Sequence, residues 1–102
     1  MKPGFRFTPD RVADLDTIWH FIAADGADAA DRVEQTILAA CETLSRYPLR
    51  GDTRRAITKL PVRFWTVPRY PNYIIVYRPD ANPLQVVRIL HAKRNLKRIL
   101  GR

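Results

Sequence analysis

The sequence predicts a single α+β domain in which a helical hairpin packs on one face of a small antiparallel sheet. In the first half of the chain, apolar residues recur every three or four positions, as on the buried face of a helix. In the second half, short runs of β-branched and aromatic residues lie between prolines, as in a set of short strands. The length of 102 residues and the 46% of apolar residues suit one domain, residues 1–102, with an ordinary core. The expected element order is β-α-α-β-β-β, followed by a short basic C-terminal helix or tail.

The first expected elements are a short strand and a helix. Apolar and polar residues alternate over residues 5–8, as in a half-buried strand. Thr8 can then cap a helix that begins with Pro9, because a threonine hydroxyl accepts from the first helical N–H groups and proline is tolerated in the first turn. The apolar stripe of this helix comprises Val12, Leu15, Ile18, Trp19 and Ile22. Gly26 can end the helix in the left-handed conformation.

A second helix is expected from Asp28 to about Arg46. Its buried stripe comprises Val33, Ile37, Ala40, Cys41 and Leu44. The helix ends here because Tyr47 precedes Pro48, and the residue before a proline avoids helical geometry. The connection to the first helix is short, so the two helices should pack as an antiparallel hairpin. Cys41 lies on the apolar stripe, and we interpret it as a core residue rather than a nucleophile.

Three further strands are expected at residues 62–67, 72–78 and 84–91. Prolines follow the first two strands, and residues 79–83 contain two prolines, an aspartate and an asparagine, which is a strong turn signal. Because these connections are short, the three strands should form an antiparallel meander, and the first strand of the chain should pair with one of them. The hairpin covers one face of the sheet, so the other face is expected to be free for function.

The charge of the chain is strongly asymmetric. The whole chain has a formal net charge of +8. Residues 1–45 contain four basic and eight acidic residues, a net charge of −4, whereas residues 46–102 contain fourteen basic residues and only Asp52 and Asp80, a net charge of +12. Segregated charge of this kind indicates an acidic partner, either nucleic acid or an acidic protein surface.

Several function classes are not supported by the sequence. No apolar run approaches the roughly 20 residues that span a bilayer, and no signal peptide is visible. One cysteine and two distant histidines, His20 and His91, give no zinc site and suit a reducing compartment. The chain also lacks a phosphate-binding glycine loop, a serine elbow and a metalloprotease motif. We therefore expect a cytoplasmic protein with no cofactor, no metal and no membrane contact.

Arginine and aromatic residues on the expected strands are the remaining candidates for chemistry. They comprise Arg63, Arg69, Arg78 and Arg88 with Trp65, Tyr70, Tyr73 and Tyr77, and Lys93 and Arg94 follow them. Guanidinium groups bind phosphate and carboxylate, and aromatic faces can stack on bases. The pattern is compatible with RNA binding or cleavage, although about half of the aromatic residues should belong to the core. His91, which ends the last strand, is either a general acid–base group or a structural one.

Four motifs occur in order along nearly the whole chain. Phe-Thr-Pro at residues 7–9 leads from strand into helix, and Arg-Tyr-Pro at residues 46–48, with Gly51, ends the second helix. Residues 69–78 form an aromatic strand, and residues 86–95 form a hydrophobic strand that runs into His-Ala-Lys-Arg-Asn. This series resembles the RelE/ParE superfamily of toxins from bacterial type II toxin–antitoxin modules, whose ParE-like members end in His-x-x-Arg-Asp/Asn.

The superfamily has two functional branches, and the resemblance is greater to the ParE-like branch, whose members inhibit DNA gyrase. The RelE-like branch cleaves mRNA in the ribosome and typically has a catalytic arginine in the central strand, where this chain has Ile74. That branch also often has a C-terminal tyrosine, and this chain has no aromatic residue after Arg94. The resemblance therefore implies a gyrase inhibitor rather than an enzyme. The alternatives are a ribosome-dependent mRNA interferase, with Arg63, Arg88, His91 and Arg94 as candidate catalytic residues, and a non-catalytic basic RNA-binding module.

The resemblance also implies partners and a target-binding surface. A toxin of this kind is neutralised by an acidic, ParD-like cognate antitoxin, with which it can form a hetero-oligomer, and its target is DNA gyrase or, in the alternative, the ribosome and mRNA. The candidate target-binding residues are Arg69, Tyr73, Arg88, His91, Lys93, Arg94, Lys97 and Arg98. Among them Arg94 is the strongest candidate, because a guanidinium binds phosphate or carboxylate through two hydrogen bonds.

Overall fold

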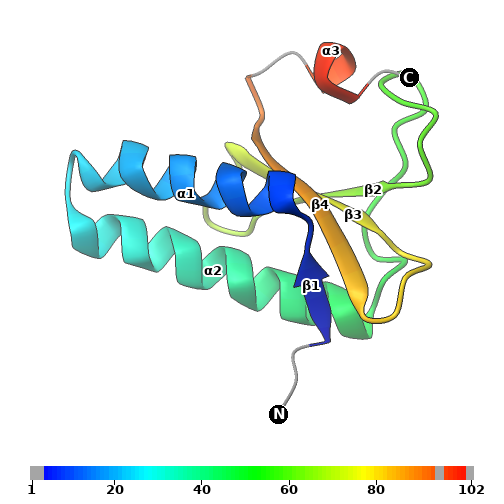
Figure 1. Ribbon diagram of the computed structural model, residues 1–102, viewed down its shortest axis with the longest axis horizontal. Coiled ribbons are helices and arrows are strands. Elements are labelled where there is room, and N and C mark those ends of the chain that lie inside the picture. The colour runs from blue at the N-terminus through cyan, green and yellow to red at the C-terminus, as the bar shows by residue number, and fades with distance from the viewer. Residues whose placement is uncertain (1–3, 94–95, 101–102) are drawn as a thin grey trace.

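The computed structural model describes the backbone of residues 4–93 and 96–100, and its elements follow the expected order (Figure 1). The elements are β1 (Phe5–Phe7), α1 (Pro9–Ala23), α2 (Ala27–Arg46), β2 (Arg63–Thr66), β3 (Tyr73–Arg78), β4 (Leu84–His91) and α3 (Leu96–Leu100). The predicted α+β class and the predicted order β-α-α-β-β-β with a short C-terminal helix are confirmed.

The four strands form one sheet in the order β1-β4-β3-β2. The last three strands form the expected antiparallel meander, in which Ile75 of β3 lies opposite Trp65 of β2 and Ile89 of β4. The first strand pairs with a later one, as expected, but this pairing with β4 is parallel, with Phe7 opposite Val86, so the sheet is mixed and not wholly antiparallel as predicted. A parallel pair needs a long crossover, and here the whole helical hairpin and the β2–β3 hairpin lie between the two strands.

The helical hairpin covers one face of the sheet and forms the main core. Figure 1 shows α1 and α2 side by side across this face. The apolar stripe of α2 is buried and comprises Ala30, Val33, Ile37, Ala40, Cys41 and Leu44. Cys41 is completely buried, which agrees with its interpretation as a core residue. The indole Nε1 of Trp19 on α1 donates to the Asp31 carboxylate on α2 at 2.9 Å, which ties the two helices together.

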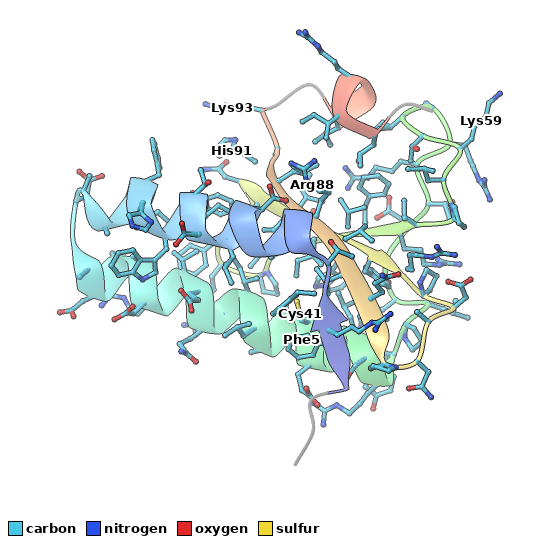
Figure 2. The ribbon with its side chains drawn as sticks, in the orientation of Figure 1. Phe5, Cys41, Lys59, Arg88, His91 and Lys93 are labelled. Carbon is cyan, nitrogen blue, oxygen red and sulfur yellow. The ribbon has the colours of Figure 1, made fainter. Side chains whose placement is uncertain are left out.

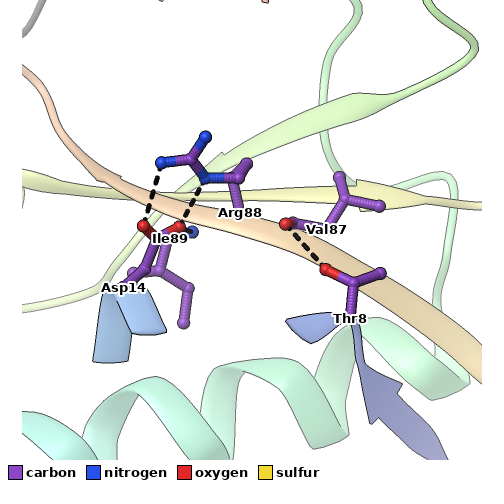
Figure 3. A network of polar contacts seen from close by, with 5 residues as sticks. All are labelled: Thr8, Asp14, Val87, Arg88 and Ile89. Carbon is purple, nitrogen blue, oxygen red and sulfur yellow. Dashed lines mark hydrogen bonds and ion pairs between the residues drawn. The ribbon is translucent and has the colours of Figure 1, made fainter. Parts of the chain in front are cut away.

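The step from β1 into α1 differs from the expectation. Thr8 lies at the helix start but makes no capping hydrogen bond with its side chain. Its hydroxyl donates instead to the backbone carbonyl of Val87 at 3.0 Å (Figure 3). Its N–H donates to Val86 O at 3.1 Å. The prediction of a capping hydroxyl was wrong because the carbonyl row of β4 passes within its reach. Thr8 thus fixes the start of α1 to the central strand.

The second face of the sheet is not free, contrary to the expectation. A second core covers it and comprises Val62, Phe64, Ile74, Val76, Leu90, Leu96 and Leu100. The short helix α3 and the segment before β2 supply its outer layer. The buried Thr58 hydroxyl donates to Leu100 O at 2.5 Å and accepts from Leu60 N–H at 3.2 Å. Thr58 thus joins the segment before β2 to α3. The sequence did not reveal this because three apolar residues on five-residue α3 are too few for a clear helical pattern.

A tyrosine inside the main core holds the loop that follows α2. The hydroxyl of Tyr77 on β3 donates to Pro48 O at 2.6 Å and accepts from Gly51 N–H at 2.9 Å. A Cβ on Gly51 would lie 2.5 Å from this hydroxyl and 2.8 Å from Phe64 O, so no larger residue fits without displacing the core. The proline and the glycine after α2 are therefore both part of one structural contact.

We expect Tyr77→Phe to lower the free energy of unfolding by about 1–2 kcal/mol at neutral pH, because the Gly51 N–H then lacks its partner. Burial raises the pKa of Tyr77 above its ordinary value of 10.0, and the hydrogen bond from Gly51 and the charge of Arg63 only partly oppose this. Above about pH 10 the unfolded chain therefore loses this proton before the folded one does, and stability should fall as the pH rises.

Urea denaturation of each variant at about pH 7 and about pH 10.5 tests both expectations, because it gives the free energy of unfolding at the two pH values. Burial also raises the pKa of Tyr73, so Tyr77→Phe should reduce the alkaline loss rather than abolish it. Tyr70→Phe, which removes a hydroxyl outside this contact, serves as the control. Equal stability of Tyr77→Phe and the parent protein at neutral pH would contradict the structural role.

Candidate target-binding surface

Arg88 of β4 forms a two-point ion pair with Asp14 of α1 (Figure 3). The guanidinium Nε and Nη2 donate to the two carboxylate oxygens at 2.7 and 2.9 Å. One of these oxygens also accepts from the backbone N–H of Ile89 at 2.9 Å. The Asp14 side chain is 10% exposed and that of Arg88 is 24% exposed, so the pair is screened from water more than a surface pair. In this position Arg88 holds α1 against the central strand.

Arg63 of β2 is also engaged with the protein. Its guanidinium Nη1 donates to the backbone carbonyl of Gly51 at 2.6 Å and lies 3.4 Å from that of Leu49. The charge of Arg63 therefore lies beside the Tyr77 hydroxyl, at the loop that Tyr77 holds. Arg63 and Arg88, both candidate catalytic residues of a ribonuclease, are therefore each bound to a group of the protein itself.

The sheet does not bring Arg63 and Arg88 together. Arg63 lies opposite Tyr77, which belongs to the main core, whereas Arg88 lies opposite Val76, which belongs to the second core. β3 lies between the strands that carry the two arginines. Each guanidinium is held by a different part of the fold, Arg63 by the loop after α2 and Arg88 by α1.

His91 and Tyr73 lie together at the end of the sheet, beside α1. Their rings pack edge to face, with centroids 5.5 Å apart and an interplanar angle of 82°. The backbone N–H of Lys93 donates to His91 Nδ1 at 3.1 Å, which places the proton of the neutral ring on Nε2. Burial raises the pKa of Tyr73, so the phenol stays protonated at neutral pH. Both residues were candidates for target binding, and the structure brings them into contact.

A shallow groove of about 220 Å³ opens in front of this pair. Its lining comprises Asp14, Thr17, Ile18, Phe21, Tyr73, Ile89 and His91. Phe21 is 74% exposed, the largest exposure among the exposed large apolar residues of the described chain. Sequence reasoning missed this groove. Asp14, Ile18 and Phe21 follow one another by four and three residues, so they share one helix face, and that spacing is the signal that could have revealed it.

The other predicted target-binding cations lie around the C-terminal end of the chain or on a turn. Lys93 and Arg98 are exposed to solvent. Figure 2 shows Lys93 beyond the end of β4, near His91. Lys97 lies in α3, and Arg94 lies outside the described residues. Arg69 is exposed on the turn between β2 and β3, with a φ of 71°. This turn lies at the same end of the sheet as His91, since Tyr73 pairs with His91.

The described residues contain no group of histidine, cysteine, aspartate and glutamate side chains that could hold a metal ion. In the same part of the chain, none of the helices has the length and apolar character that a membrane crossing requires. The surface described above combines exposed cations, one histidine and apolar side chains with the carboxylate of Asp14, which is already paired with Arg88. Its chemistry is therefore that of a binding surface for an anionic or amphipathic partner.

A helical hairpin on a four-stranded mixed sheet, with a strongly basic second half of the chain, agrees with the class expected from the sequence, the toxins of type II toxin–antitoxin modules. Residues 5–96 match the model of the family described as ParE toxin of type II toxin–antitoxin system, parDE, and the chain belongs to this family. Among solved structures, a chain of a chromosomal ParDE toxin–antitoxin system from P. aeruginosa is similar at a TM-score of 0.70 and 25% sequence identity. The similarity covers 87% of this chain and 95% of that one. No curated protein matches the sequence.

We expect Asp14→Ala to lower the free energy of unfolding by about 1.5–3 kcal/mol, because it removes the acceptor of a charged group and of the Ile89 N–H. Asp14→Asn keeps one acceptor oxygen but loses the charge, so its free energy of unfolding should lie between those of Asp14→Ala and the parent protein. Asp16→Ala is the control on the same helix, since Asp16 is exposed and pairs only with His20 among the described residues. Thermal and urea unfolding measure the difference, and an unchanged Asp14→Ala would show that α1 is held by packing alone.

Proposed function

We propose that this chain is a toxin that binds and inhibits DNA gyrase and that a cognate antitoxin neutralises it. The observation that carries the proposal is the position of Ile74 within the family fold. The ribonuclease branch needs an arginine at this point of the central strand, and here the side chain is 4% exposed inside the second core. A charged group at this position would have no access to solvent or substrate.

The state of the candidate catalytic residues supports the same conclusion. RNA cleavage requires donors positioned around one phosphate, and a general base within hydrogen-bond reach of the 2′-hydroxyl. Arg63 and Arg88 lie on different strands, and each binds a different group of the protein itself, the Gly51 carbonyl and the Asp14 carboxylate. The alternative of a ribosome-dependent mRNA interferase would need these contacts to break.

We place gyrase binding at the C-terminal end of β4, where exposed cations and apolar groups adjoin each other. Lys93 is exposed beside His91, and the groove with Phe21 lies next to them. Interfaces of this composition combine an apolar centre with a charged rim. The cations recognise an acidic surface or phosphate, and the groove accepts an apolar side chain of the target.

The proposal predicts that the purified protein inhibits supercoiling of relaxed plasmid by purified DNA gyrase. Gel electrophoresis of the plasmid measures both the loss of supercoils and any cleaved DNA that accumulates. Messenger RNA in a bacterial translation extract should stay intact at the same toxin concentration. Normal supercoiling together with codon-specific cleavage of mRNA would overturn the proposal and establish the interferase alternative.

A charge variant tests the location. Lys93→Ala with Arg94→Ala should raise the concentration for half-inhibition at least about tenfold, because charge-assisted contacts at interfaces contribute about 1.5–3 kcal/mol each. Arg6→Ala with Arg32→Ala removes the same number of charges from the acidic half and is the matched control. Circular dichroism establishes that both variants fold. Full inhibition by the first variant would place the gyrase-binding surface elsewhere.

The partner proposal rests on the family and on charge. The solved relative belongs to a ParDE toxin–antitoxin system, and by analogy we propose an acidic, ParD-like antitoxin that forms a hetero-oligomer with this chain. Its binding segment would be acidic because the second half of the toxin has a net charge of +12. It would also carry apolar side chains, since Phe21 and the adjoining groove leave apolar surface exposed.

Association of toxin and antitoxin should accordingly slow as salt rises, while dissociation changes less, because opposite charges steer the encounter. Stopped-flow fluorescence at about 50 mM and about 500 mM salt measures both rates, and the association rate should fall about tenfold or more. Phe21→Ser, in contrast to added salt, should speed dissociation and leave the association rate unchanged. An association rate independent of salt would contradict the electrostatic part of the proposal.

A further inference from the structure

A second basic surface lies on the opposite side of the fold from the hairpin connection, along the edge of the sheet that β2 forms. Residues 46–65 contain six basic residues and one acidic residue, Asp52. We call the basic set the β2-edge patch, and it comprises Arg46, Arg50, Arg54, Arg55, Lys59 and Arg63. The segment between α2 and β2 that carries most of it runs up one side of the molecule in Figure 1, and Lys59 points outward from it in Figure 2.

The backbone of this segment is fixed to the sheet. Asp52 exchanges two hydrogen bonds with Phe64 of β2, at 3.0 and 2.8 Å, and so adds a bridge outside the edge strand. Tyr77 and Arg63 hold Gly51 from inside, and Thr58 joins the far end of the segment to α3. The cations of the patch therefore stand on an ordered surface.

Arg50 is the most specific feature of the patch. Its guanidinium carbon lies 5.6 Å from the ring centroid of Tyr47 and 5.7 Å from that of Trp65, which is the geometry of cation–π contacts with both rings. No hydrogen bond or ion pair joins the Arg50 side chain to another described residue, and the residue is exposed. Stacking thus orients the guanidinium while its N–H donors remain available to an external anion.

Some cations of the patch bind other groups of the protein, and the rest are exposed and available to a ligand. Arg54 pairs with Asp52 at 3.1 Å, and Arg63 binds Gly51 O. Arg46, Arg50, Arg55 and Lys59 are exposed, and the described structure gives their side chains no carboxylate partner. Four available cations with no available carboxylate among them form a surface of one sign, whereas the centre of a protein–protein interface is usually depleted of charge.

The chemistry of the patch suits phosphate, and it favours a duplex over single strands. A planar guanidinium held in one orientation suits two oxygens of a phosphate. Single-strand binding needs several aromatic faces on which successive bases stack. Here Trp65 is partly buried against the main core, and Tyr47, although 60% exposed, stacks on Arg50. Several available cations with a single exposed ring suit the closely spaced phosphates of duplex DNA.

We propose that the β2-edge patch binds the phosphate backbone of duplex DNA without sequence preference. This contact is additional to gyrase binding at the C-terminal end of β4 and does not require gyrase. A toxin that acts on a DNA-bound enzyme gains from a second contact to the DNA, because two linked contacts act at high effective concentration.

Fluorescence anisotropy of a labelled duplex of mixed sequence tests the proposal with the purified full chain and no gyrase present. The slope of log affinity against log salt counts the phosphates neutralised, and Arg50→Gln with Arg55→Gln should reduce it by about two. At about 100 mM salt this variant should bind at least about tenfold more weakly. Arg6→Gln with Arg32→Gln removes two charges elsewhere and should leave both quantities nearly unchanged.

Two further variants test the role of stacking. Tyr47→Ser removes one of the rings that orient Arg50 and should weaken DNA binding several-fold, whereas Tyr47→Phe keeps the ring and should bind as the parent does. Parent-like DNA binding by Arg50→Gln/Arg55→Gln would overturn the proposal. So would unchanged DNA binding with lost affinity for a poly-glutamate peptide, since the patch would then recognise carboxylates. Gyrase inhibition is measured separately, so its failure would leave these results unaffected.

Discussion

The carboxylate of Asp14 is the interaction on which the arrangement of the domain depends. It joins the first helix to the central strand by accepting from Arg88 and from the Ile89 backbone, across more than seventy residues of sequence. Beyond the hydrogen bonds of Thr8 at the start of α1, the helical hairpin rests on the sheet chiefly through apolar contacts, which have no direction. Charge-assisted hydrogen bonds do have direction, so they set the position of α1 over β4. The same carboxylate lines the groove beside His91, and the geometry of the binding surface therefore follows from the packing of the helix.

The second core sets the other limit on function. A four-stranded sheet of this size could offer its second face to a substrate, and in this chain α3 and the segment before β2 cover it. Ile74 is buried there, and the hydrogen bond from Thr58 to Leu100 holds the cover in place. The exposed cations therefore lie at the rim of the sheet, at the end of β4 and along β2. Because both faces of the sheet are covered, the proposed binding surfaces lie at its edges and in the groove beside α1.

Local patterns in the sequence were enough to predict the helices and strands. They did not predict the hydrogen bonds between residues that lie far apart in the sequence. Helical spacing placed the buried stripe of α2, and prolines placed the ends of β2 and β3, because these patterns reflect near neighbours. Thr8 has the ordinary sequence of a helix cap, but its hydroxyl binds Val87, which lies 79 residues away. Arg88 appeared available for a target for the same reason, since its partner Asp14 lies in a segment that sequence patterns treat separately. Of the residues that line the groove, the sequence analysis named His91 and Tyr73 as candidates and did not name Phe21.

The division of the arginines explains why a net charge of +8 does not by itself locate a site. Arg54, Arg63 and Arg88 have partners inside the fold, and their charges stabilise the structure. Arg50 is equally well oriented, but aromatic rings rather than carboxylates hold it, so its donors remain available. An ion pair neutralises the charge that it positions, whereas a stack of rings positions a charge and leaves it to act on a partner. This difference in the kind of support, more than exposure or charge count, distinguishes a cation that builds the fold from one that serves binding.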